Sequence, residues 1–122
     1  MNKVHLYREL AQFFEEKGDY ERAKRLLTAA YQWAKEMLAD DHPDLMADLY
    51  NLGLLCLALD DHAGAEEYLL SALRMQTRQL GPEHQDVKET ENALAMLYTE
   101  QDVFALVKPL RMNEKAVLCS AC

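Results

Sequence analysis

LGPEHQDV at residues 80–87 is the second copy of a pattern that first occurs as LADDHPDL at residues 38–45. The two copies lie 42 positions apart, since 80 minus 38 is 42. The same interval separates small residues on either side of them, such as Ala23 and Ala65. A fixed period of this length is typical of stacked helical hairpins, in which each hairpin needs a neighbour to bury its apolar face.

The composition between these turns favours helices. Only four Gly and three Pro occur among 122 residues, and Pro43 and Pro82 both fall where the repeated pattern turns. The other positions are rich in Ala, Leu, Glu, Lys, Arg and Met, which are good helix formers. We therefore expect one all-α domain over residues 1–118, with three tandem helical hairpins at about residues 2–43, 44–85 and 86–118 and a disordered tail at residues 119–122.

The charge of the chain narrows the class of partner. Thirteen basic residues against 21 acidic ones give a net charge of −8, and the basic residues form no stripe. Nucleic acid and anionic membranes are therefore poor partners, whereas a basic or apolar peptide would be attracted. The longest apolar stretch, Leu52–Leu59, has 8 residues, and a membrane span needs about 20. These features predict a cytoplasmic protein.

Apolar residues recur at steps of three and four along each predicted helix. Gly53 falls within such a helix, where glycine costs about 1 kcal/mol relative to alanine, so we expect it where two helices approach closely. In the first unit, the inner face of the first helix is predicted to hold Val4, Tyr7, Leu10, Ala11 and Phe14.

These positions resemble the tetratricopeptide repeat. The likeness rests on Leu52, Gly53 and Cys56 in one predicted helix and on Ala65, Leu69 and Ala72 in the next. The linker at residues 80–87 is similar to the Leu-Gly-x-x-His-Pro-Asp-Val linker of the kinesin light chain-like subclass, whose repeat has the same period. The resemblance implies a right-handed superhelix whose first helices line a concave groove for a partner's peptide or helix. It also implies an adaptor or scaffold with no catalysis and no cofactor.

The resemblance also implies which side chains line that groove. In the kinesin light chains, a Leu-Asn-Asn-Leu-Ala motif supplies an Asn that holds the bound peptide's backbone, and Asn51 matches that Asn here. Only Arg8 is basic among the lining positions, so the expected ligand has an apolar anchor and basic flanks. The predicted groove residues are Arg8, Glu9, Gln12, Tyr50, Asn51, Leu54, Leu57, Asn92 and Met96.

Other residues invite a reading as a chemical site. His42 and His84 lie beside carboxylates, but one histidine per repeat before an acidic helix start is typical of a turn, so no metal site is predicted. Cys119 and Cys122 have the spacing of a redox, zinc or lipidation motif, although a disordered tail is the simpler interpretation. Cys56 is expected to be a small buried hydrophobe. No catalytic constellation stands out, so an enzyme is not predicted.

A second hypothesis remains open from the sequence. The repeats could self-associate end to end, or form a structural segment of a larger multidomain signalling protein. An uncapped first hairpin would expose apolar residues around Phe13, Phe14 and Trp33 that another unit would cover.

Overall fold

The computed structural model describes residues 3–40 and 42–99, and helices joined by short turns account for nearly all of them. Residues 85–99 form a further helical stretch, and no strand occurs in the described ranges. The all-α prediction is confirmed. The named helices are α1 (Lys3–Glu16), α2 (Tyr20–Met37), α3 (Pro43–Ala58) and α4 (His62–Leu80).

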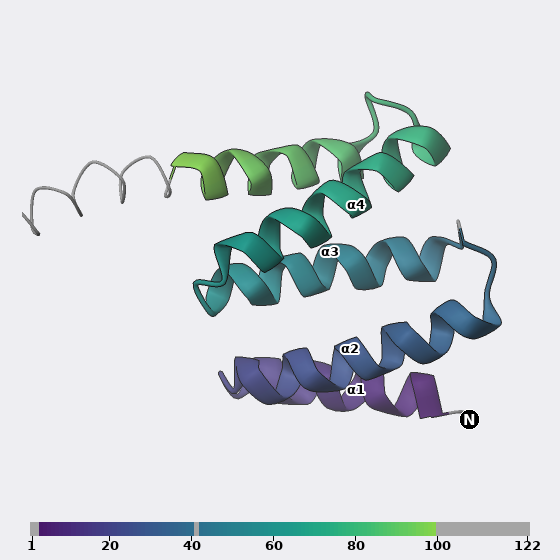
Figure 1. Cartoon of the computed structure of the whole chain (residues 1–122), viewed down its shortest axis with the longest axis vertical. Coiled ribbons are helices and arrows are strands. Elements are labelled where there is room, and N and C mark those ends of the chain that lie inside the picture. The colour runs from purple at the N-terminus through teal and green to yellow at the C-terminus, as the bar shows by residue number, and fades with distance from the viewer. Residues whose placement is uncertain (1–2, 41, 100–122) are drawn as a thin grey trace, which may run out of the picture.

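The helices form hairpins that stack along the longest axis of the molecule (Figure 1). α1 packs against α2, α3 packs against α4, and α2 joins the two hairpins through contacts with α3. The helical stretch at residues 85–99 then lies against α4 and starts the third unit (Figure 1). The predicted second helix of that unit and the predicted tail at residues 119–122 lie outside the described residues.

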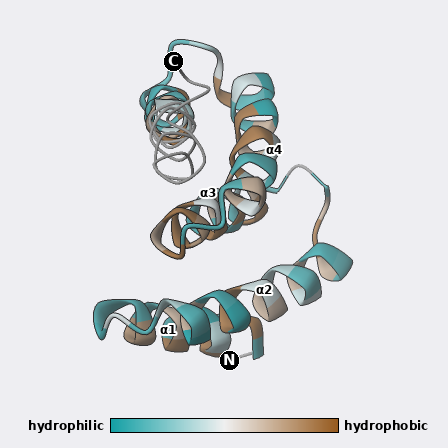
Figure 2. Ribbon diagram, turned by 60° about the vertical axis from the view of Figure 1, so that its left-hand side comes forward, coloured by the Kyte–Doolittle hydropathy of each residue, from teal (hydrophilic) through white to brown (hydrophobic). Residues whose placement is uncertain are grey.

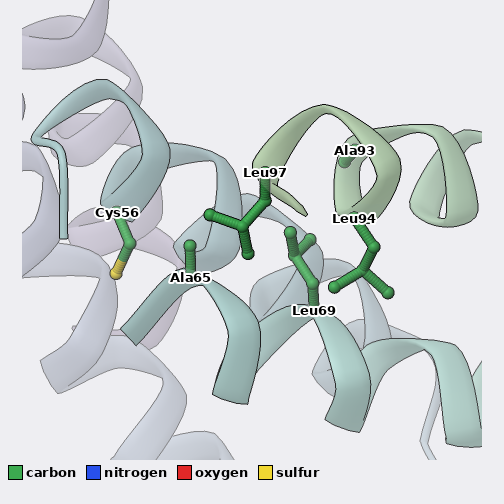
Figure 3. Packing of buried hydrophobic residues seen from close by; sticks show 6 residues of the cluster. All are labelled: Cys56, Ala65, Leu69, Ala93, Leu94 and Leu97. Carbon is green, nitrogen blue, oxygen red and sulfur yellow. The ribbon is translucent and has the colours of Figure 1, made fainter. Parts of the chain in front are cut away.

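α3 is the most deeply buried helix because the first hairpin covers one side of it, and α4 together with residues 85–99 covers the other. Hydrophobic residues predominate along it (Figure 2). On one side, Leu52 and Leu55 pack against Ala23 and Leu27 of α2. On the other side, Cys56 joins a cluster with residues of α4 and of the stretch 85–99, namely Ala65, Leu69, Ala93, Leu94 and Leu97 (Figure 3).

Cys56 behaves as the sequence predicts, as a small residue of the core. Its side chain is fully buried. Burial raises the pKa of the Cys56 thiol, because the thiolate would lose its hydration, so the neutral form is favoured.

The repeated histidines begin the first helix of their units. His42 Nδ1 accepts a hydrogen bond from the backbone N–H of Asp44 at 3.0 Å, and His84 Nδ1 accepts one from that of Asp86 at the same distance. Pro43 follows His42 at the first helical position, where its missing N–H leaves no bond unmade. The prediction that these histidines are turn residues is confirmed, and their specific role is to cap a helix.

The effect of this cap on stability can be tested by substitution. We expect His42→Ala to lower the free energy of unfolding by about 1 kcal/mol, because one backbone donor at the start of α3 loses its acceptor. His42→Asn is the matched control, since an asparagine oxygen can accept the same bond. Urea unfolding followed by circular dichroism measures both. An equal loss in the two variants would show that packing of the imidazole matters and capping does not.

The prediction for one inner-face residue of the first helix is wrong. Leu10 is predicted on the inner face of its helix, yet it is 37% exposed. The residues 42 and 84 positions later, Leu52 and Leu94, are 0% and 5% exposed, because the preceding hairpin covers them. The first unit has no such cover among the described residues. Periodicity identifies the correct face but not whether a neighbour lies on it.

Candidate functional site

Two clefts lie along the first helices of the units, where the groove is predicted. The Arg8 cleft, of about 340 Å³, lies between α1 and α3 and is lined by Arg8, Gln12, Glu15, Asp48 and Asn51, among others. The Tyr50 cleft, of about 300 Å³, lies between α3, the end of α4 and residues 85–99. Asn51 lines both clefts, so it stands at their junction.

An ion pair crosses the Arg8 cleft. Arg8 donates two hydrogen bonds to the carboxylate of Asp48, with Nε at 3.0 Å from Oδ1, and its Nη1 lies 3.8 Å from a carboxylate oxygen of Asp44. Asp48 is only 3% exposed. Burial raises the pKa of the Asp48 carboxyl, although the Arg8 guanidinium opposes the shift. The one basic residue predicted in the groove is therefore already paired within the protein.

Asp48 is a residue of the candidate site that the sequence analysis did not predict. Its signal is visible in hindsight, because Asp48 is the only charged residue between Leu45 and Leu59 in a strongly apolar helix. A lone charge of this kind indicates a buried partner. The partner lies 40 positions away on α1, which no local pattern reveals.

The Tyr50 cleft combines apolar walls with an acidic rim. Met46, Ala47, Tyr50 and Leu80 supply apolar surface, and Asp86 and Glu89 supply carboxylates. Burial raises the pKa of the Tyr50 hydroxyl, and the nearby carboxylates of Glu89 and Asp86 raise it further. The cleft therefore has apolar walls and negative charge at its rim.

A buried polar pair supports one wall of the Tyr50 cleft. Gln76 of α4 lines the cleft and is only 5% exposed. The hydroxyl of Thr90 donates to Gln76 Oε1 at 2.6 Å. This bond joins the second unit to the third across the wall of the cleft.

Four of the nine predicted groove residues line a cleft, and five do not. Arg8 and Gln12 line the Arg8 cleft, Tyr50 lines the Tyr50 cleft, and Asn51 lines both. The other five line neither cleft. Glu9 pairs with His5 at 3.0 Å, Leu54 and Leu57 pack against the core cluster around Leu69, Asn92 is exposed, and Met96 is 59% exposed.

A stack of helical hairpins with equivalent residues at a constant interval defines a repeat protein of the solenoid class. The family model described as "Tetratricopeptide repeat" matches residues 4–78 and 45–102. The chain belongs to the tetratricopeptide repeat family, whose members generally mediate interactions between proteins.

The chain is also similar to a curated protein and to a solved structure. It is 29% identical over 114 residues to "Tetratricopeptide repeat protein 23" from Homo sapiens, a match that covers 93% of this chain and 25% of the human protein. The chain therefore spans about a quarter of that relative's length. The crystal structure of BtubC (BKLC) from P. vanneervenii matches with a TM-score of 0.75 and 22% identity, covering 80% of this chain and 39% of BtubC. At that identity the match shows the shared fold alone.

The described ranges were compared with the requirements of a membrane-spanning helix and of a metal site. No helix there combines the length and the apolar character that a membrane crossing requires. No group of three or more His, Cys, Asp or Glu side chains in those ranges could hold a metal ion.

Proposed function

We propose that the chain is a non-catalytic adaptor or scaffold module that binds a segment of a partner protein along its two clefts. The observation that carries this proposal is the position of Asn51. Its side chain stands at the junction of the Arg8 and Tyr50 clefts and is exposed, so its amide can both donate to and accept from an extended backbone.

The charges around the clefts support a segment with basic flanks. Arg8 is neutralised by Asp48, while Glu15, Asp86 and Glu89 remain at the edges of the two clefts. An acidic segment would meet these carboxylates without a free cation to balance them. The apolar walls beside Tyr50 favour an aliphatic or aromatic anchor between the basic flanks.

The subclass assignment is also part of this proposal. We infer a repeat of the kinesin light chain-like subclass, because the two capping histidines and the two linkers both recur at an interval of 42 positions. The groove nevertheless departs from the light-chain pattern. Glu9 and Ala93 stand where the other two units would carry the residue equivalent to Asn51. One anchoring asparagine instead of three predicts a shorter bound segment.

A peptide array tests the assignment. We expect peptides with an aromatic or aliphatic centre between lysines to bind, and the same centres between glutamates to fail. Asn51→Ala should weaken binding at least about tenfold, because the anchored peptide amide loses its partner. Asn92→Ala is the matched control, since Asn92 is also exposed but lines neither cleft. Equal binding by Asn51→Ala and the wild type would place the ligand elsewhere.

The alternative of self-assembly has one observation in its favour, which is apolar surface on the first hairpin. Phe13 is 49% exposed there, whereas Phe14 and Trp33 are partly buried. This apolar surface lies outside the two clefts.

A further inference from the structure

α1 carries a stripe of exposed apolar residues outside the clefts. Leu6 is 45% exposed, Leu10 is 37% exposed and Phe13 is 49% exposed. Their spacing of four and three places them on one face of the helix. We call this surface the N-terminal face, because it lies on the first hairpin of this chain, α1 and α2 (Figure 1).

The corresponding positions of the other units are buried. One period after Leu10 and Phe13 stand Leu52 and Leu55, which are 0% and 2% exposed. Two periods after them stand Leu94 and Leu97, which are 5% and 0% exposed. The stripe on α1 is thus equivalent to the surface by which the second and third units pack against the preceding hairpin.

The structure also shows what kind of element covers the equivalent surfaces of the second and third units. Leu52 and Leu55 pack against Ala23 and Leu27 of α2. Leu94 and Leu97 face Leu69 in the equivalent cluster, where Ala65 and Leu69 belong to α4 (Figure 3). In both units the cover is therefore a helix that presents alanine and leucine four positions apart.

Charge distinguishes the N-terminal face from its equivalents. Lys3 and Lys17 extend the stripe at its two ends, three positions before Leu6 and four after Phe13. Leu45 and Val87, which correspond to Lys3, are both 1% exposed. Both lysines are exposed, and no ion pair within the described ranges uses them. The face is apolar in the middle and cationic at both ends.

We propose that the N-terminal face binds an amphipathic helix of a partner protein that has small and apolar residues at its centre and acidic residues at both ends. The apolar stripe would pack against the apolar residues at the centre of the bound helix. Lys3 and Lys17 would pair with the acidic residues at its two ends. A second copy of α1 does not fit. In either orientation it would bring lysine against lysine at both ends of the contact.

A pocket beside Lys3 enlarges this binding surface. It has a volume of about 220 Å³ and is lined by Lys3, Val4, Trp33, Glu36 and Met37. Met37 is 63% exposed, and Lys3 Nζ lies 4.5 Å from the centroid of the Trp33 ring. One apolar side chain near the end of the bound helix would fill the pocket, while an acidic neighbour would reach Lys3.

Two designed helical peptides test the proposal on the full chain. Both carry alanine and leucine spaced as Ala65, Leu69 and Ala72 are in α4, and they differ only in having glutamates or lysines at both ends. Fluorescence anisotropy should show the glutamate-ended peptide binding at least about tenfold more tightly. Leu10→Glu should abolish that binding without unfolding the chain, because Leu10 is already partly exposed. Met96→Glu, at a more exposed apolar side chain on another helix, is the control and should bind as the wild type does.

A charge reversal separates this surface from the clefts. The double variant Lys3→Glu, Lys17→Glu should bind the lysine-ended peptide more tightly than the glutamate-ended one. Asn51→Ala should change the affinity for neither of the two peptides. Equal binding of the two peptides, or binding that survives Leu10→Glu, would overturn the proposal. So would a dimer seen by light scattering and abolished by Leu10→Glu, because it would identify a second copy as the occupant. If the array peptides failed to bind the clefts, the results expected for the two helical peptides would not change.

Discussion

Replacing Arg8 with alanine is expected to lower the free energy of unfolding by about 3 kcal/mol. The reason is the burial of its partner, because Asp48 is 3% exposed and would keep a charge with no counterion. The Arg8 side chain is itself 26% exposed, so the effect lies at the lower end of the range for buried ion pairs. Urea unfolding at neutral pH gives the value.

The double variant Arg8→Met, Asp48→Leu is the control for this prediction. It removes both charges and keeps apolar volume at the junction, so it should be within about 1 kcal/mol of the wild type. A double variant as unstable as Arg8→Ala would show that the shape of the pair matters more than its charge.

The loss in Arg8→Ala should shrink as the pH falls. Burial already raises the pKa of Asp48, and loss of the guanidinium, which lowers it, raises the folded-state pKa further above the unfolded value of 3.8. Between those two values the folded state holds more protons than the unfolded state, so stability increases as pH decreases. Unfolding curves from pH 7 down to pH 4 should therefore converge with those of the wild type. A constant difference would mean that Asp48 is not the source of the loss.

Leu69→Ala should also destabilise the fold by about 3 kcal/mol. Leu69 is completely buried, and it packs between the second and third units in the cluster of Figure 3. Removal of its side chain leaves a cavity bounded by Leu94 and Leu97 on one side and by Gly53 on the other. Thermal or urea unfolding measures the loss.

The contact between Gly53 and Leu69 can be tested by combining Leu69→Ala with a substitution at Gly53. A Cβ at Gly53 would lie 2.6 Å from both Cγ and Cδ2 of Leu69, so Gly53→Ala should destabilise the wild type by about 1 kcal/mol or more. In the Leu69→Ala background the obstruction is gone, and the same change should stabilise α3 by up to about 1 kcal/mol through helix propensity. Additive effects in this double-mutant cycle would contradict the close contact.

Short-range patterns in the sequence predict much of this architecture. The interval between the two linkers predicts the hairpins, and the residues before Asp44 and Asp86 predict the turns, because capping and periodicity are local properties. Gly53 is likewise predicted at a close approach of helices, and Leu69 provides it.

The candidate site was only partly predictable, because it depends on contacts between distant residues. Arg8 is predicted to face a ligand, yet Asp48, 40 positions later, engages it. Glu9 lies one position from Arg8, and that single step turns it away from the clefts. Leu10 shows the same limit, since its pattern is that of Leu52 while its burial depends on whether another hairpin lies against it.

The units of this chain are not interchangeable modules. Leu6, Asp48 and Thr90 occupy one register position, yet Asp48 reaches back to Arg8, Thr90 reaches back to Gln76, and Leu6 is exposed. Excision of the middle unit would remove Asp48 and Gln76 together, so neither polar junction could re-form between the units that remain. The order of the units therefore matters to their packing, even though their backbones are alike.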